Sequence, residues 1–237
     1  TNKAYSAESN NVEDFFRQAV RSITSVSVDK GSDMGSIRFS YTNNSSNSII
    51  ENSDLSSHNF NLRAVNNLSD KLTVDTKATF FTQDVNNRAS TTGAQGLLSA
   101  VYNMPRNVAI DDLRNYQMAN PATPEDYNVI RYADGNVSNP FWQIYNDETS
   151  VRRNRFLGFA KVNYQFTDWL SAFVRIGGDM TSIRDNKIYR PGHHFINLGS
   201  MEIGESTFKE INSEFLVTAK RDLTDKINIV ANIGGNM

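Results

Sequence analysis

Long stretches of this chain alternate apolar and polar residues with a period of two. Between residues 155 and 166, the even positions include Phe156, Val162 and Tyr164, whereas Lys161 stands at an odd position. Because neighbouring residues of a β-strand point to opposite faces, this alternation predicts strands with one apolar and one polar face. The sequence therefore predicts an all-β fold.

The same alternation recurs along the chain and predicts about eight strands. We expect them at roughly 23–29, 35–44, 57–66, 71–83, 155–166, 170–179, 214–220 and 226–233. Several of these runs reach about ten residues, whereas strands of ordinary globular sheets have about 5–6. A tilted strand that crosses a membrane needs about 9–11 residues. Strand length therefore favours a segment of an antiparallel, up-and-down transmembrane β-barrel.

The connections between the predicted strands fall into two classes. Three are turns of a few residues, at Ser69-Asp70, Thr167-Asp168 and Thr224-Asp225, and the others are far longer. Outer-membrane barrels have short periplasmic turns at one end and long extracellular loops at the other. In such a barrel, Phe166 and Trp169 would belong to the aromatic girdle nearest the short turns, although Trp169 has the parity of the polar face.

Composition limits the classes of protein and of partner that this chain can represent. The mean hydropathy of -0.50 fits a soluble protein, but long strands with one polar face would give the same average. No uninterrupted apolar run approaches the roughly 18 residues of a membrane helix, which excludes helical insertion. With 24 Lys+Arg against 26 Asp+Glu and no basic stripe, nucleic acid is not an expected partner. The absence of cysteine excludes disulfides and thiolate metal sites.

The segment 86–152 is a long polar insertion that interrupts the strand pattern. Within it, 94–102 and 110–118 have short helical patterns. A connection of this length in a compact domain usually has a function of its own. Aromatic side chains in a polar loop can stack on sugar rings or anchor a partner, but they can equally pack the loop onto itself. The candidates for contact with a ligand or a partner are Tyr102, Arg106, Phe141, Trp142 and Tyr145.

No catalytic, metal or cofactor site is predicted, and the chain is not expected to be an enzyme. His58, His193 and His194 are expected in loops, with no HExxH spacing for zinc. The acidic pairs Asp111-Asp112 and Asp147-Glu148 lack the alternating ligands and glycine of a calcium loop. Neither a G-x-S-x-G elbow nor a G-x-G-x-x-G phosphate loop occurs.

Several short motifs follow one another in a fixed order over nearly the whole chain. They are Asp14-Phe15-Phe16, Arg38-Phe39-Ser40-Tyr41-Thr42, Asn52-Ser53-Asp54-Leu55, Met104-Pro105-Arg106, Asn139-Pro140-Phe141-Trp142, Arg153-Asn154-Arg155-Phe156-Leu157-Gly158 and Thr167-Asp168-Trp169-Leu170. With these motifs the chain resembles the barrel of SusC/RagA-type TonB-dependent transporters, the outer-membrane nutrient importers of Bacteroidetes. It departs from that family at Ile49-Ile50-Glu51, where the family usually has Gly-Ile-Ile-Pro.

The resemblance implies a fragment of a larger importer. Family members are several times longer, with an N-terminal plug inside a 22-stranded barrel, and this chain would be the first third or so of the barrel. Residues 1–22 would link plug to barrel and 23–237 would form a partial barrel surrounded by outer-membrane lipid. The implied activity is import of oligosaccharides or peptides. The implied partners are a SusD-like surface lipoprotein and TonB, the latter acting through the missing plug region.

A soluble β-sandwich that binds glycans at the cell surface is the alternative, since sandwich strands also alternate. The barrel predicts that three valines face lipid: Val74, Val162 and Val174. It also predicts that three cations face the lumen: Lys77, Lys161 and Arg175. In a sandwich the valines would instead meet a second sheet in a closed core.

Overall fold

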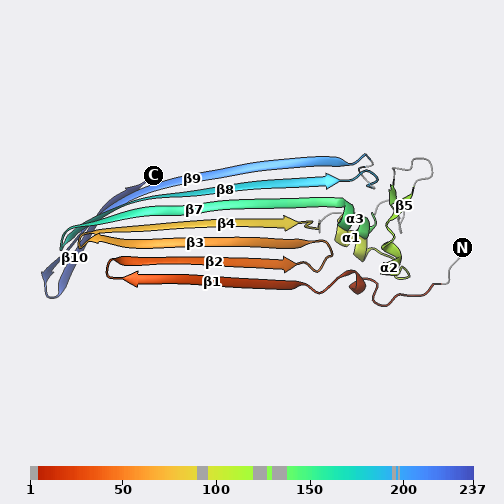
Figure 1. The fold of residues 1–237 in the computed structure, drawn as a ribbon, viewed down its shortest axis with the longest axis horizontal. Helices are drawn as coiled ribbons and strands as arrows, with labels where there is room; N and C mark the ends of the chain where they lie inside the picture. The colour runs from red at the N-terminus through yellow and green to blue at the C-terminus, as the bar shows by residue number, and fades with distance from the viewer. Residues whose placement is uncertain (1–4, 90–95, 120–126, 130–137, 194–195, 197) are drawn as a thin grey trace.

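The computed structural model describes residues 5–89, 96–119, 127–129, 138–193, 196 and 198–237. Eight strands form one sheet in the order β1-β2-β3-β4-β7-β8-β9-β10, and every neighbouring pair is antiparallel (Figure 1). The strands are β1 Val20–Ser32, β2 Gly35–Asn47, β3 Asp54–Ser69, β4 Leu72–Asn86, β7 Asp147–Thr167, β8 Leu170–Tyr189, β9 Ser200–Thr224 and β10 Ile227–Asn236. The predicted all-β, up-and-down sheet is confirmed.

The strands continue beyond the stretches of clear alternation. Strand β7 has 21 residues, and its first half, Asp147 to Asn154, is almost entirely polar. Periodicity places the start of this strand near Arg155, because a run of polar residues has no apolar face to detect. The ladder with β4 nevertheless extends to Ser150, since backbone hydrogen bonds do not depend on an apolar face.

The connections separate cleanly by length. Four two-residue turns lie at one end of the sheet, which we call the turn end: Asp33-Met34, Asp70-Lys71, Asp168-Trp169 and Asp225-Lys226. The connections 48–53, 87–146 and 190–199 lie at the opposite end, which we call the loop end (Figure 1). The predicted alternation of short turns and long loops is therefore confirmed.

Three of the turns fall one residue later than predicted, and their repeated sequence explains why. The Ser or Thr before each Asp remains the last residue of its strand. The backbone N–H of Lys71 donates to Ser69 Oγ at 3.3 Å, and that of Lys226 donates to Thr224 Oγ1 at 3.3 Å. In the third turn, Leu170 N–H donates to Thr167 Oγ1 at 3.1 Å. Trp169 therefore lies in the turn itself, outside the strand pattern.

The register separates the sheet into two chemically different faces. Val74, Val162 and Val174 are direct partners across β4, β7 and β8, so their side chains project to one face, which we call the apolar face. Lys161 and Arg175 are partners one position further along, on the opposite or polar face. Lys77 lies on the polar face too, two residues along β4 from Asp75, the partner of Lys161. The predicted separation of valines from cations is confirmed.

No second sheet packs against the apolar face within the described residues. Val162 is 43% exposed and Val174 is 53% exposed. The other sheet of the described chain is a ribbon of two short strands, β5 Gln117–Ala119 and β6 Tyr127–Val129. A sandwich would bury these valines, so the structure does not support the sandwich alternative. None of the helices in the described segments is both long and apolar enough to cross a membrane.

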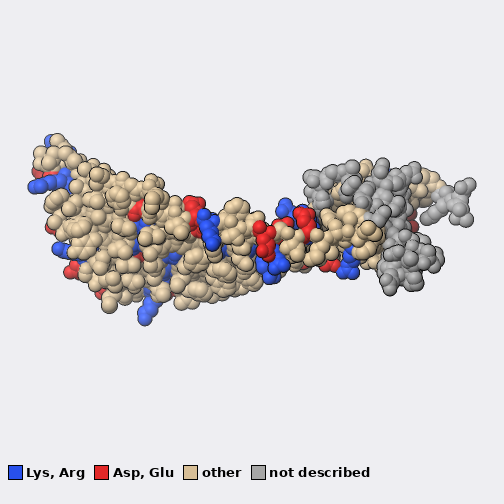
Figure 2. All heavy atoms as spheres, turned by 90° about the horizontal axis from the view of Figure 1, so that it is seen from above, with Lys and Arg blue, Asp and Glu red and all other residues tan. Residues whose placement is uncertain are grey.

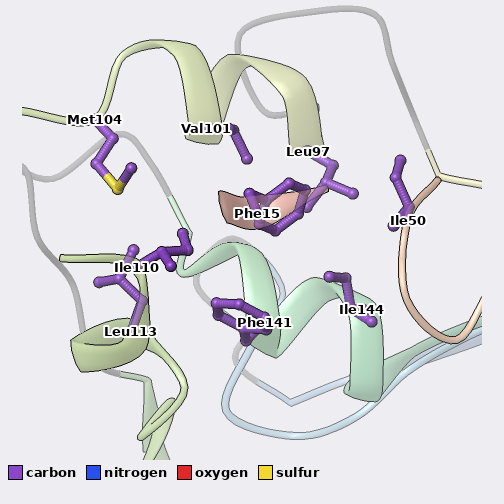
Figure 3. Close-up of a cluster of buried hydrophobic side chains, with 9 residues drawn as sticks. All are labelled: Phe15, Ile50, Leu97, Val101, Met104, Ile110, Leu113, Phe141 and Ile144. Atoms are coloured by element: carbon purple, nitrogen blue, oxygen red, sulfur yellow. The ribbon is translucent and has the colours of Figure 1, made fainter. Parts of the chain in front are cut away.

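The buried hydrophobic residues of the described chain gather at the loop end rather than under the sheet (Figure 3). A 3-10 helix, Glu13–Phe15, packs there with α1 Leu97–Tyr102, α2 Ile110–Leu113 and α3 Pro140–Asn146. We call this cluster the loop-end core, and its members are Phe15, Ile50, Leu97, Val101, Met104, Ile110, Leu113, Phe141 and Ile144. It joins the N-terminal segment, the β2–β3 connection and the long insertion into one unit.

Candidate functional site

A row of aromatic side chains crosses the apolar face toward the loop end. Tyr41, Phe60, Phe80 and Phe156 are successive partners on β2, β3, β4 and β7. The ring centroids of Tyr41 and Phe60 lie 4.8 Å apart, and those of Phe60 and Phe80 lie 6.4 Å apart. We call these four residues the upper aromatic row. The row could not be predicted from the sequence, because strand register is needed to align its members.

A second aromatic pair lies near the turn end. The rings of Tyr164 and Phe166 meet edge to face at 4.8 Å. From Phe156 to Phe166, β7 spans 11 residues, close to the roughly 9–11 that a tilted membrane strand requires. The apolar face between the two aromatic levels carries the three valines described above. An apolar band bounded by aromatic residues at both edges has the pattern of a membrane-spanning wall.

The polar face is organised by ion pairs. Arg63 donates to both carboxylate oxygens of Asp75, at 3.1 and 2.9 Å, and Arg155 does the same to Asp179. Arg175 lies 3.4 Å from Glu214. Figure 2 shows further acidic and basic side chains gathered where the molecule narrows between the wall and the loop end. Arg63, Arg155 and Arg175 are therefore each matched by a carboxylate on a neighbouring strand.

Glu51 is the centre of a polar cluster at the loop end. Its carboxylate accepts two hydrogen bonds from Arg114, at 2.9 and 3.2 Å, and one from the Tyr145 hydroxyl at 2.6 Å. The bond from Arg114 is the main reason that the pKa of Glu51 lies below its usual range. The same bonds raise the pKa of Arg114 and of Tyr145. The ring of Tyr145 stacks on Tyr116 with a centroid distance of 5.6 Å.

The β2–β3 connection is attached to the insertion by this cluster. Asn52, which has a positive φ of 56°, donates from Nδ2 to the carbonyl of Ile144 at 2.9 Å. Ile50 lies 6% exposed in the loop-end core. The departure from the family pattern at Ile49-Ile50-Glu51 therefore falls on residues that hold the insertion in place.

The N-terminal segment is attached to the insertion through Arg106 and Asn11. Arg106 donates to Asn11 Oδ1 at 3.0 Å and to the carbonyl of Ser9 at 2.9 Å. Asn11 is 1% exposed, and its Nδ2 donates to the carbonyl of Pro105 at 3.1 Å. Phe15 completes the attachment, with its ring 5.6 Å from that of Phe141. This segment is therefore part of the loop-end unit.

The structure separates the five predicted site residues. Phe141 and Trp142 are buried in helix α3, which is the packing role that the sequence analysis left open. Arg106 bonds to the N-terminal segment, and Tyr145 is 38% exposed with its hydroxyl on Glu51. Tyr102 projects from α1 and is 64% exposed. Contact with a ligand or partner remains a prediction for these residues, and exposure favours Tyr102 and Tyr145.

The other residues of the polar cluster around Glu51 were not predicted. Glu51, Arg114 and Tyr116 come together only through contacts between distant segments. Helix α3 had a local signal: Asn139 accepts a hydrogen bond from Phe141 N–H at 2.8 Å, and Pro140 occupies the first helical turn. An Asn N-cap followed by proline is a recognised helix start, so this helix could have been predicted.

The histidines lie in different settings. His58 was expected in a loop although it falls within the strand predicted at 57–66, and the loop expectation is wrong. It lies in β3, where its Nδ1 is 2.8 Å from the Tyr41 hydroxyl. His193 lies in the β8–β9 connection, with Nε2 3.4 Å from Asp147 Oδ2. Burial raises the pKa of Asp147, and the bond to His193 opposes that effect. His194 lies outside the described residues.

Acidification is expected to release the β2–β3 connection from the insertion. Because the pKa of Glu51 is lowered by folding, its contribution to stability is present above the unfolded value of about 4.3 and is lost as the pH falls through the lower folded value. Hydrogen exchange at residues 48–53, corrected for the intrinsic pH dependence, should therefore accelerate below about pH 4.

The matched variant is Glu51→Gln, which should loosen the connection by about 1–3 kcal/mol at neutral pH and remove the acid step, because the wild-type protein itself loses this contribution once Glu51 is protonated. Asp147 cannot produce the same step, because its raised pKa makes its contribution disappear as the pH rises. An unchanged acid step in Glu51→Gln would contradict this assignment.

The arrangement of the sheet is shared with solved transporter structures. A chain of "Structure of the RagAB peptide transporter" matches with a TM-score of 0.72 and 14% identity, over 97% of this chain and 25% of that chain. Structures of the RagAB peptide importer in the 'closed-closed' and 'open-open' states each match with a TM-score of 0.67, at 15% and 16% identity, over 94% and 95% of this chain. The chain has the fold of part of such a transporter.

The match covers about a quarter of each RagAB chain. A scan against protein-family models finds no match, and a search of curated proteins finds none either. The fold expected from the sequence resemblance is therefore confirmed, and the neighbours are transporters rather than enzymes.

Proposed function

We propose that this chain is a wall segment of a TonB-dependent outer-membrane importer. The observation that carries the proposal is the apolar face, which is exposed, 11 residues tall along β7 and bounded by aromatic residues at both edges. In water this apolar surface would remain exposed to solvent, whereas in a membrane the lipid chains would cover it. The fold shared with RagAB transporter chains supports the same function.

In the proposed orientation the polar face lines the lumen. A Lys or Arg that faces lipid at the bilayer midplane costs about 2–4 kcal/mol. The three cations that were predicted to face the lumen all lie on the polar face: Lys77, Lys161 and Arg175. Lumen water and neighbouring carboxylates would solvate them there. The long connections would then lie outside the cell and the short turns in the periplasm.

The proposed cargo is a peptide or an oligosaccharide. The structural neighbours are described as peptide importers and transporters, which favours a peptide. We propose that a SusD-like surface lipoprotein contacts the loop end, with Tyr102 and Tyr145 among the residues that face the lipoprotein or the cargo. TonB would act through a plug region outside this chain, and residues 1–22 would link that plug to the barrel at 23–237. We propose no catalytic role.

Uptake by cells that produce the intact protein tests this function. Labelled oligopeptides and oligosaccharides should be supplied separately, with and without an uncoupler that removes the proton-motive force. The proposal predicts uptake of one class that depends on the protein and stops with the uncoupler. Uptake that continues without the proton-motive force would contradict TonB dependence, and location of the protein outside the outer-membrane fraction would contradict the proposal as a whole.

A further inference from the structure

A row of charged side chains crosses the apolar face beyond the upper aromatic row. Asp84, Arg152, Arg184 and Glu205 are successive partners on β4, β7, β8 and β9. A row of uncharged polar residues separates them from the aromatic level: Thr82, Asn154, Ser182 and Thr207. Along β7, Arg152 lies four residues beyond Phe156, about 13 Å at ~3.3 Å per residue. This order follows the layers of a membrane: hydrocarbon, interface and headgroups.

Arg152 and Arg184 are direct partners on neighbouring strands. Two positive charges in this arrangement repel each other unless a negatively charged group lies between or beside them. Arg152 donates from Nε to Asp84 at 2.6 Å. Arg184 Nε lies 3.6 Å from Glu205, beyond hydrogen-bond distance. The side chains of Arg152 and Arg184 are 65% and 56% exposed. Within the described residues, neither guanidinium forms a bidentate pair with a carboxylate.

Arginines on the polar face behave differently. Arg63 and Arg155 each direct Nε and a terminal nitrogen to the two oxygens of one carboxylate. Their paired hydrogen-bond donors are therefore already occupied by Asp75 and Asp179. The exposed pair Arg152 and Arg184 therefore differs from the arginines of the polar face. Arg63 on β3 and Arg155 on β7 can serve as controls for substitutions of this pair.

A depression opens beside the charged row on the side of the loop end. Its volume is about 510 Å³, and its lining combines hydrogen-bonding groups with apolar side chains. The polar lining includes Asn86, Ser150, Arg184, Asn186 and Glu148, whose carboxylate is paired with Arg190, and the apolar lining includes Ile188, Met201 and Ile203. The hydrogen-bonding groups of this lining suit the polar part of a headgroup that extends beyond the charged row.

We infer that Arg152 and Arg184 bind the phosphate of a lipid headgroup in the leaflet that meets the loop end. The inference rests on the proposed function, because it requires the apolar face to lie in a membrane. A phosphate has several acceptor oxygens, so it accepts hydrogen bonds from two guanidinium groups and relieves their mutual repulsion. The depression would hold the remainder of the headgroup.

Lipid retention by the intact protein tests the inference. Native mass spectrometry would count bound lipid after reconstitution with phosphatidylglycerol, or with a galactosyl diacylglycerol that lacks phosphate. The intact protein should retain phosphatidylglycerol preferentially. The double variant Arg152→Gln/Arg184→Gln should retain it roughly tenfold to thirtyfold less tightly. The matched control Arg63→Gln/Arg155→Gln removes the same charge from the polar face and should retain it normally.

Each other outcome identifies what fails. Unchanged retention in Arg152→Gln/Arg184→Gln, or an equal loss in the control, would overturn the headgroup site and leave the wall proposal intact. Displacement of the lipid by millimolar inorganic phosphate would overturn the lipid as the ligand. Retention of neither lipid by the unmodified protein would contradict the proposed membrane wall itself. The variant Arg152→Lys/Arg184→Lys keeps both charges and should show an intermediate affinity if guanidinium geometry contributes.

Discussion

Val162→Arg is expected to lower the free energy of unfolding from lipid vesicles by about 2–4 kcal/mol. Val162 lies between Val74 and Val174 in the apolar band, six residues from Phe156 and four from Phe166 along β7. An arginine there would face hydrocarbon with no carboxylate partner on the same row. The measurement is the free energy of unfolding by urea from vesicles that contain the intact protein.

The neighbouring residue provides the control for this substitution. Asn163→Arg introduces the same side chain one position away, on the polar face, where Asn163 is opposite Thr73 and Phe173. Its effect should remain within about 0.5 kcal/mol. Equal destabilisation by the two substitutions would show that the faces do not differ in their environment.

Phe141→Ala is expected to destabilise the loop-end core by about 3–5 kcal/mol. Phe141 is fully buried, contacts the ring of Phe15 and lies under the guanidinium of Arg114, which is 4.6 Å from the ring centroid. The loss of this side chain would therefore weaken the contacts of the N-terminal segment and of the Glu51 cluster together. Hydrogen exchange should show faster exchange in 97–102, 110–113 and 140–146 while the sheet remains protected.

Tyr102→Ala is the control, because Tyr102 lies in the same unit but is 64% exposed. It should change exchange rates little, with a stability effect within about 0.5 kcal/mol. Loss of protection throughout the sheet in Phe141→Ala would contradict the view that the loop-end core is stabilised separately from the wall.

The strands of this protein were predictable because side-chain alternation is local. Val162 and Lys161 reveal the two faces of β7 without any knowledge of its partners. The predicted strand ends were less accurate where a strand is polar on both faces, as in the first half of β7. Turn positions shifted by one residue because the Ser or Thr that caps each turn belongs to the strand.

The loop-end site was not predictable in the same way, because its contacts join residues far apart in sequence. Asn11 and Pro105 are separated by 94 positions, and Glu51 and Arg114 by 63. Nothing in the sequence near Glu51 indicates that an arginine will reach it. The upper aromatic row is an intermediate case: the parity of Phe156 was visible, but its alignment with Phe80 and Phe60 depends on strand register.

Single-cysteine scanning of the intact protein tests the central claim most directly, and this chain contributes no cysteine of its own to the background. A fluorophore attached at position 162 or 174 should be quenched by nitroxides on lipid acyl chains and protected from a water-soluble quencher. A fluorophore at position 161 or 175 should show the reverse. This alternation would establish that the apolar face contacts lipid and the polar face contacts water. Equal access of the water-soluble quencher to all four positions would contradict the account of this chain as a membrane wall.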